Sequence, residues 1–315
     1  MTDFLPKGHQ VLAERLIEGR HVARMININA QSKALALLAG RRRIRQRGRG
    51  VDFEEVRLYA PGDDIRTIDW RVTARSGDPH TKLFQEDREQ PIVLMVDLRS
   101  PMWFGSKNCF KSVLASHVAS VLAWAGLEAG ERVGGIAMTD AGIFEIKPQR
   151  SKRSVLRLLR LLESAPSPDV ATNDHNRAVS WSTALNQLKS LSRPGARLML
   201  ISDFNDFLSE PNVEKTLRDI VGHRQVVCFK VTDPLDATLP PAGRYAISDG
   251  SRQIKMDTSQ QAIRQRYQVD FERSQQEVIE YLRRYQVPLV TVDTDENPNE
   301  LCLLYTSDAA DELRS

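Results

Sequence analysis

Four aspartates stand where carboxylates could bind a cation. Asp97, Asp203, Asp233 and Asp293 each lie at or just past the end of an apolar segment that is typical of a buried strand. Because the carboxyl ends of parallel strands share one edge of a sheet, where open α/β folds bind ligands, we expect these side chains at that edge. Asp233 and Asp293 are explained more simply as residues that start loops or cap helices. Asp97 and Asp203 are therefore the candidate site.

Arg99 lies two residues after Asp97 and carries a permanent charge that can fork onto a carboxylate. In one hypothesis its guanidinium takes the place of a cation by pairing with Asp97, Asp203 or both. In the alternative, Arg99 is a surface residue and the site has simply been lost. Both interpretations are consistent with the sequence.

Motifs of common enzyme classes are missing. The six histidines show no H-x-x-x-H or H-E-x-x-H spacing, and neither a G-x-x-x-x-G-K-[ST] phosphate loop nor a G-x-S-x-G nucleophile motif occurs. We therefore expect a protein that is not an enzyme and needs no cofactor.

The segment Arg41–Arg49 holds six arginines in nine residues. Such a run could bind the phosphates of a nucleic acid. It has no interleaved aromatic residues for base stacking, and the net charge of the whole chain is only +3. We prefer a solvated segment that pairs with acids such as Glu54 and Glu55, and nucleic-acid binding through Arg41–Arg49 is the less favoured alternative.

The elements that must position these residues follow from the apolar pattern. The unbroken apolar runs 92–96 and 198–201 predict strands buried on both faces, as in a parallel sheet, and the mainly apolar segments 226–231 and 288–292 predict two more strands. Helical spacing predicts helices at 10–40, 107–127, 151–163, 178–191 and 258–285. Residues 133–138 and 142–146 predict a hairpin at one edge of the sheet. The fold class is therefore α/β, with a doubly wound, mostly parallel sheet.

Composition indicates an ordinary globular chain. Of 315 residues, 41% are hydrophobic and 27% are charged. No apolar run approaches the roughly 18 residues of a transmembrane helix, and the start of the chain lacks a secretory pattern. The three cysteines (Cys109, Cys228 and Cys302) form no C-x-x-C motif, so we expect a reduced, cytoplasmic protein.

The stretch Arg47–Arg75 reads RGRGVDFEEVRLYAPGDDIRTIDWRVTAR. It resembles the signature of the domain of unknown function 58 family. The residues that fit are Arg47, Gly48, Gly50, Phe53, Arg57, Tyr59, Gly62, Asp63, Asp64, Arg66, Ile68, Asp69, Trp70, Ala74 and Arg75. The Pro61-Gly62 pair suits a turn, so we expect a β-hairpin in this region.

The signature can be interpreted in two ways. Its charged and aromatic side chains could form a surface for a protein partner: Arg57, Tyr59, Asp63, Asp64, Arg66, Asp69, Trp70 and Arg75. We favour a mainly structural role, in which Trp70 is buried, Gly62 lies in the turn and the acids pair with arginines.

Residues 91–300 resemble a von Willebrand factor A domain, as the C-terminal part of this family does. That resemblance implies a metal-ion-dependent adhesion site with a D-x-S-x-S loop, a threonine and a later aspartate. Asp97 and Asp203 match the acids, whereas Arg99 and Pro101 replace the serines. We therefore expect a degenerate site in which Mg²⁺ is disfavoured, and a metal-dependent binder of a protein ligand through Asp97 and Asp203 is the alternative function.

The family resemblance also implies a partner, an AAA+ ATPase of the MoxR type. The expected function is that of a non-catalytic adaptor in the assembly or maturation of other proteins, without a transmembrane segment. The expected organisation is a helical segment at 1–40, the signature region at 41–90, the von Willebrand factor A-like domain at 91–300 and a tail at 301–315. The run LCLLYTSDAADE in that tail resembles a translated sequencing adapter, so we expect the tail to be non-native.

Overall fold

The computed structural model describes residues 6–24, 26, 52–60, 68–85, 90–165, 179–210, 212–248 and 253–296. The chain divides into two compact units. The larger unit comprises residues 1–41 and 90–315, and the smaller unit comprises residues 42–89. The Arg41–Arg49 run and the tail at 301–315 lie outside the described residues.

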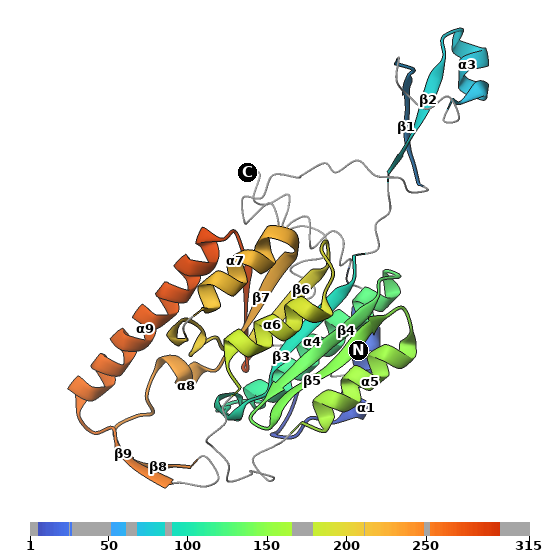
Figure 1. Ribbon diagram of the computed structural model, residues 1–315. Helices are drawn as coiled ribbons and strands as arrows, with labels where there is room; N and C mark the ends of the chain where they lie inside the picture. The colour runs from blue at the N-terminus through green and yellow to red at the C-terminus, as the bar shows by residue number, and fades with distance from the viewer. Residues whose placement is uncertain are drawn as a thin grey trace. The chain divides into compact units, whose positions relative to one another are not determined.

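A six-stranded sheet forms the centre of the larger unit, in the order β10-β7-β6-β3-β4-β5 (Figure 1). Five strands are parallel: β3 (Ile92–Asp97), β4 (Val133–Thr139), β6 (Arg197–Ser202), β7 (Gln225–Thr232) and β10 (Leu289–Asp293). The sixth, β5 (Gly142–Gln149), pairs antiparallel with β4 at one edge. The predicted α/β class, the parallel strands and the edge hairpin are therefore confirmed.

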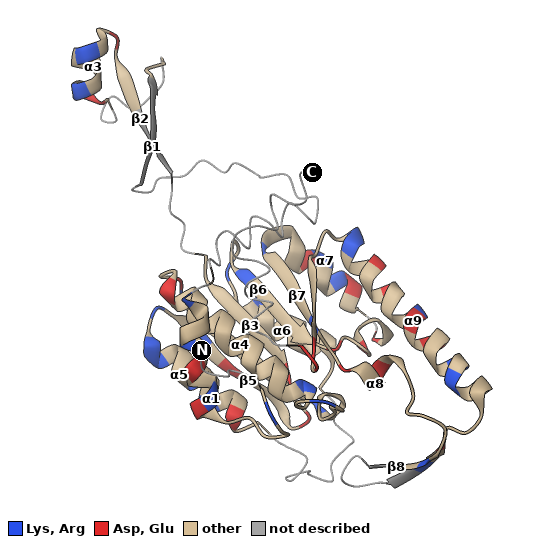
Figure 2. Ribbon diagram, turned by 180° about the vertical axis from the view of Figure 1, so that it is seen from behind, with Lys and Arg blue, Asp and Glu red and all other residues tan. Residues whose placement is uncertain are grey.

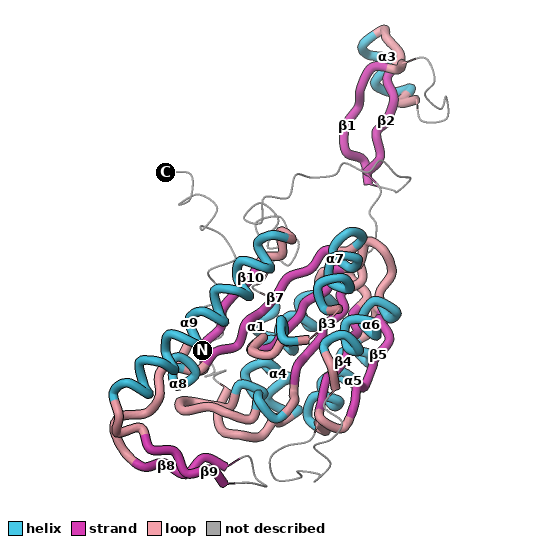
Figure 3. Tube along the Cα trace, turned by 60° about the vertical axis from the view of Figure 1, so that its left-hand side comes forward, coloured by secondary structure: helices cyan, strands magenta, loops and turns pink. Residues whose placement is uncertain are grey.

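Helices cover both faces of this sheet (Figure 3). One face is covered by α4 (Lys111–Glu128) and α5 (Lys152–Glu163), on which α1 (Ala13–Ala23) packs, and the other by α6 (Trp181–Leu191), α7 (Val213–His223) and α9 (Gln261–Arg284). Alternate residues of β3 enter the two apolar clusters, so that Leu94 packs towards α4 and Met95 towards α6. This two-sided burial explains why the strand is apolar at every position.

The N-terminal helix α1 belongs to this core. Leu16 is fully buried, and its carbonyl oxygen accepts hydrogen bonds from the Ser120 hydroxyl and, at 3.4 Å, from the Trp124 indole, both on α4. Because α1 covers the side of α4 that faces away from the sheet, α4 is apolar around most of its circumference. The segment expected as a separate part at 1–40 is, in its described portion, a layer of the larger unit.

Two further elements of the larger unit were not expected from the sequence. Helix α7 precedes β7, and an antiparallel pair, β8 (Arg244–Ser248) and β9 (Gln253–Asp257), precedes α9. Short helical turns follow three strand ends: η2 (Ser100–Met102), η5 (Phe207–Ser209) and α8 (Pro234–Ala237). In the described part of the chain, no helix has both the length and the apolar character needed to cross a membrane.

The smaller unit contains an antiparallel strand pair and a helix. Strand β1 (Asp52–Leu58) pairs with β2 (His80–Gln85), with an irregularity between Phe53 and Glu55. Helix α3 (Trp70–Ser76) lies between them in sequence, where the predicted hairpin required the second strand to begin. The expected second strand within Arg47–Arg75 was therefore wrong, because α3 takes its place and the partner of β1 is β2 further along the chain; Pro61 and Gly62 of the expected turn lie outside the described residues.

Local sequence signals explain why α3 is a helix. The Asp69 carboxylate accepts the backbone N–H groups of Arg71 at 3.0 Å and Val72 at 3.3 Å, which caps the first turn. Gly77 ends the helix with a φ of 82°, a left-handed conformation that favours glycine. Trp70, which we expected to be buried, is 67% exposed at the first position of this helix.

Candidate functional site: a buried set of charges at the strand ends

The carboxyl ends of β3, β6 and β7 bring three of the predicted aspartates to one edge of the sheet. Asp97, Asp203 and Asp233 are all buried there. A buried carboxylate is unfavourable unless it is paired with a cation or satisfied by hydrogen-bond donors. The partners of each aspartate therefore determine whether its carboxylate is available to bind a cation or to exchange a proton.

Arg99 forks between two carboxylates. Its Nε and Nη2 atoms donate to the two oxygens of Asp97 at 3.0 and 2.8 Å, and Nη1 and Nη2 donate to Asp206 at 2.7 and 3.0 Å. The side chain is almost fully buried. The predicted pairing of Arg99 with Asp97 is confirmed, whereas its second partner is Asp206 instead of Asp203. The alternative that Arg99 is a surface residue was wrong.

Neighbouring side chains hold this fork in place. Ser202 at the end of β6 donates its hydroxyl to Asp97 at 2.8 Å. The Trp181 indole N–H donates to Asp206 at 2.7 Å, and its ring lies 5.4 Å from the Arg99 guanidinium carbon. Burial opposes ionisation of Asp206, yet Arg99 and Trp181 hold the pKa of Asp206 below its ordinary value. Burial also acts against the charge on Arg99, but Asp97 and Asp206 outweigh it and raise the pKa of Arg99.

The turn after β6 positions Asp206. Phe204 has a φ of 58°, which is unfavourable for a residue with a large side chain. It is fully buried and packs against Trp181 and Phe207, with ring centroids 5.5 Å apart in each pair. This aromatic packing stabilises the strained turn at Phe204. The turn places Asp206, two residues later, against Arg99.

Lys111 is a second internal cation at this edge. Its Nζ atom lies 2.8 Å from Asp203 and 3.1 Å from Asp236, and the side chain is almost fully buried at the start of α4. Burial acts to lower the pKa of Lys111, but the charges of Asp203 and Asp236 outweigh it and raise the pKa. The sequence analysis missed Lys111 because its partners are 92 and 125 residues away.

Asp233 and Asp293 have the structural roles that we preferred for them. Asp233 caps α8 and also accepts hydrogen bonds from the Ser106 hydroxyl and the Thr294 hydroxyl, each at 2.6 Å. Asp293 accepts the Thr232 hydroxyl at 3.0 Å and the backbone N–H of Asp295 at 2.9 Å. Pro101, one of the positions expected to carry a metal-binding hydroxyl, lies in the first turn of η2.

Lys230 differs from the other two cations. It is nine-tenths buried on β7, and within the described ranges no hydrogen bond or ion pair reaches its ammonium group. Burial lowers the pKa of Lys230, against the opposing charges of Asp236 and Asp203.

The described residues contain no group of three or more His, Cys, Asp or Glu side chains arranged to hold a metal ion.

The residues proposed as a partner surface in the signature region differ in whether the structure describes them and in how exposed they are. Asp63, Asp64 and Arg66 lie outside the described residues, as does the side chain of Arg57. Tyr59 is half-buried and Asp69 caps α3, whereas Trp70 and Arg75 are exposed. The structural role expected for Trp70 was therefore wrong, and its indole lies on the surface of the smaller unit.

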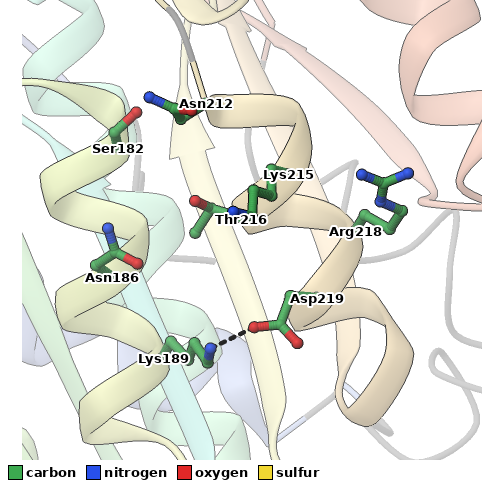
Figure 4. Close-up of a pocket in the computed structure, with 8 residues that line it drawn as sticks. All are labelled: Ser182, Asn186, Lys189, Asn212, Lys215, Thr216, Arg218 and Asp219. Atoms are coloured by element: carbon green, nitrogen blue, oxygen red, sulfur yellow. Dashed lines mark hydrogen bonds and ion pairs between the residues drawn. The ribbon is translucent and has the colours of Figure 1, made fainter.

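The larger unit also has a shallow surface pocket between α6 and α7 (Figure 4). It is lined by polar and charged side chains, among them Ser182, Lys215 and Arg218. Lys189 of α6 pairs with Asp219 of α7 across it. This pair ties the two helices together on the surface.

Known proteins resemble the chain over much of its length. The uncharacterized proteins Rv1480 of Mycobacterium tuberculosis and Mb1516 of Mycobacterium bovis are each 28% identical to it over 251 residues, which cover 79% of the chain and 77% of each relative. Among solved structures, the conserved hypothetical protein BatB from Bacteroides thetaiotaomicron is 16% identical with a TM-score of 0.42, over 72% of this chain and all of that one. The sequence pattern of the family described as "Protein of unknown function DUF58" matches residues 55–277. The chain belongs to this family.

Proposed function

We propose that the protein is a non-catalytic interaction protein that works with an AAA+ ATPase of the MoxR type in the assembly or maturation of other proteins. The larger unit acts in this proposal as a von Willebrand factor A-like module with a degenerate metal site. The observation that carries the proposal is the internal neutralisation of the strand-end carboxylates by Arg99 and Lys111.

The donor set at the strand ends does not suit Mg²⁺. That ion requires near-octahedral coordination by oxygen atoms. Both oxygens of Asp97 already accept hydrogen bonds from Arg99, and Asp203 accepts from Lys111 and from the Asn205 amide. A divalent ion would also be repelled by the two side-chain cations. We therefore disfavour the alternative of a metal-dependent binder that uses Asp97 and Asp203.

The same contacts argue against acid–base catalysis at this edge. A general acid or base must be able to exchange a proton with a substrate at hydrogen-bonding distance. Asp97 and Asp203 are buried, and their oxygens are occupied by cationic donors. An edge built in this way supports a rigid binding module better than a reaction centre.

Affinity capture from the organism of origin tests the proposal. The protein, tagged and produced near its natural level, is recovered from lysate in buffers with and without ATP, and the co-purifying proteins are identified by mass spectrometry. An AAA+ ATPase of the MoxR type is expected in the eluate of the tagged protein and absent from that of the tag alone. Recovery of no such ATPase in either buffer would remove the proposal.

Calorimetry on the purified protein addresses the metal alternative separately. Titration with MgCl₂ is expected to give only the heat of dilution. Saturable Mg²⁺ binding that disappears in the Asp97→Asn variant would favour the metal-dependent function instead.

A further inference from the structure

Strand β5 leaves one edge of the central sheet open. It is the last strand in the order β10-β7-β6-β3-β4-β5, and within the described residues it pairs only with β4. Every residue of β4 is buried, whereas no residue of β5 is buried and Phe144 is 45% exposed. The outer edge of such a strand presents a row of unpaired N–H and C=O groups, which can serve as a template for another strand.

Backbone groups of Glu145 and Lys147 face this open edge. The carbonyl oxygen of Gly142 accepts the hydroxyl of Thr139 on β4 at 3.0 Å, so Gly142 points towards β4. The carbonyl oxygen of Ile146 also lies against β4, beside Gly134. Residues of an antiparallel strand direct their N–H and C=O groups alternately to the two sides. The C=O group of Glu145 and the N–H group of Lys147 therefore point away from β4.

Lys147 and Pro148 are of the residue types that often protect a sheet edge from further pairing. The nitrogen of Pro148 lies beside Gly134 of β4, so the donor that this proline lacks is missing on the paired side of the strand. Lys147 is exposed and has no ion-pair partner in the described part of the chain. A lysine at an edge repels another lysine but can pair with an acid, so Lys147 selects among registers and does not exclude all of them.

The side chains of β5 favour one register for a second copy of the same strand. Antiparallel pairing centred on Ile146 places Glu145 opposite Lys147 of the second copy, and does so twice because the arrangement is symmetric. The same register places the exposed ring of Phe144 opposite Pro148. Pairing centred on Glu145 or on Lys147 would instead place like charges opposite each other, which is destabilising.

Glu145 and Lys147 lie two residues apart and therefore on the same face of the sheet. The amide of Gln187 on α6 donates to the Glu145 carboxylate at 2.5 Å, which identifies this face as the one that α6 covers. A carboxylate has two oxygens with several acceptor positions, so Glu145 can keep this bond and still pair with an ammonium group. The charge pair with a second copy is compatible with the contacts that Glu145 already makes.

The basic helix α5 lies beside β5 and opposes the approach of a second copy (Figure 2). Its exposed basic residues are Lys152, Arg153, Arg157 and Arg160. Salt screens the repulsion between exposed charges, whereas hydrogen bonds between strands do not depend on it, so pairing is expected in about 0.15 M salt and is expected to weaken at low salt.

We propose that the outer edge of β5 is a self-association surface, at which two copies of the protein pair their β5 strands antiparallel about Ile146. The two six-stranded sheets then form one continuous sheet. One pair of strands buries little surface, so the dimer is weak, with a Kd on the order of 10 µM. This association is a property of the protein alone and does not depend on an ATPase partner.

Sedimentation velocity of the purified protein tests the proposal, at concentrations below and above that Kd and in about 0.15 M NaCl. The wild-type protein is expected to change from monomer to dimer as its concentration rises. Glu145→Lys and Lys147→Glu each place like charges opposite one another and are expected to weaken the dimer roughly 10-fold. The double variant Glu145→Lys/Lys147→Glu restores opposite charges and is expected to regain wild-type association. Lys255→Glu, at an exposed position of β9, is the matched control and should associate as the wild-type protein does.

Disulfide cross-linking tests the register. A mixture of Glu145→Cys and Lys147→Cys proteins, both also carrying Cys302→Ser, is expected to give a cross-linked dimer on mild oxidation. Neither protein alone is expected to do so, because identical positions then lie farther apart than the roughly 7 Å between Cα atoms that a disulfide can span. The substituted residues of β5 are exposed, so the circular dichroism of every variant is expected to match that of the wild-type protein.

Two results would overturn the proposal. A wild-type protein that stays monomeric at every concentration, in high salt as well as low, would show that the edge of β5 does not take a second copy. A dimer that neither single variant weakens, or that the double variant fails to restore, would place the self-association surface elsewhere on the protein. Neither result affects the recovery of an ATPase from lysate, so this inference and the proposed function can fail independently.

Discussion

The Nζ atom of Lys111 lies 2.8 Å from Oδ2 of Asp203, and both side chains are almost completely buried. The same ammonium group reaches Asp236 on α8, so that one cation joins α4, the end of β6 and the turn after β7. Arg99 joins Asp97 at the end of β3 to Asp206 in a similar way. Four carboxylates at the strand ends are thus held by two cations of the same chain.

Removing Lys111 is expected to destabilise the protein strongly. In Lys111→Met, Asp203 and Asp236 lose their cation while remaining in the interior, and breaking a buried pair in this way costs about 3–5 kcal/mol. Urea unfolding at pH 7 measures this loss. Lys255→Met, at an exposed position of β9, serves as the control and is expected to change stability by less than about 0.5 kcal/mol. Equal stability of the two variants would show that the strand-end carboxylates do not depend on Lys111.

Lysine cannot replace arginine at position 99. A guanidinium donates to Asp97 and Asp206 at the same time, in a planar geometry that an ammonium group cannot reproduce. Arg99→Lys is therefore expected to lower the free energy of unfolding by about 2 kcal/mol, the size of a lost charged hydrogen bond. The measurement is again urea unfolding, with Arg153→Lys on the exposed side of α5 as the control. An Arg99→Lys protein as stable as wild type would contradict the importance of the fork.

His117 predicts a dependence of stability on acid pH. Burial, with a smaller contribution from the charge of Arg15, lowers the pKa of His117 to about 4 from its ordinary value of 6.5. Between these values the unfolded chain binds a proton that the folded protein does not, so stability falls as the pH falls from about 6.5 to about 4. A shift of this size is worth about 3 kcal/mol.

The contribution of His117 can be isolated by substitution. In His117→Leu the part of the pH dependence due to this residue is expected to vanish, whereas exposed His223→Leu should retain the wild-type curve. The measurement is the free energy of unfolding at several pH values between 4 and 7 for the three proteins. Parallel curves for all three would contradict the assignment.

Lys230→Met is expected to leave stability unchanged or to raise it by about 1 kcal/mol. Lys230 is nine-tenths buried and has no hydrogen bond or ion pair to its ammonium group in the described part of the chain, so an apolar side chain of similar length removes a desolvation cost. Chemical unfolding at pH 7 provides the comparison. A loss of more than about 2 kcal/mol would show that Lys230 makes a stabilising contact with the acids around it.

The sequence was informative where the pattern is local. Apolar or mainly apolar runs predicted the four parallel strands whose ends carry the aspartates, because burial on both faces favours apolar side chains. Helix α3 was missed although its signals are present: an aspartate at position 69 that can cap a helix and a glycine at position 77 that can end it. Helix α7 was also missed, although Val213, Leu217 and Ile220 follow helical spacing.

The ion pairs of the site could be predicted only in part. Arg99 and Asp97 are two residues apart, so their pairing was accessible from the sequence. Asp206 lies 107 residues from Arg99, and Lys111 lies 92 residues from Asp203. Contacts of that separation depend on how the chain crosses between layers. No sequence motif or hydrophobic periodicity predicts contacts between residues so far apart in the chain.

The hydrogen bonds from Ser120 and Trp124 to Leu16 bear on how the protein can be divided. A fragment that starts at residue 90 would keep every strand of the central sheet but leave the outer side of α4 bare, and that side is apolar. Such a fragment is expected to aggregate, and a synthetic peptide of residues 6–24 should rescue it by covering the exposed side of α4 again. The first helix and the sheet would then behave as two halves of a complementation pair, and light scattering with and without the peptide would show whether their association restores a monodisperse protein.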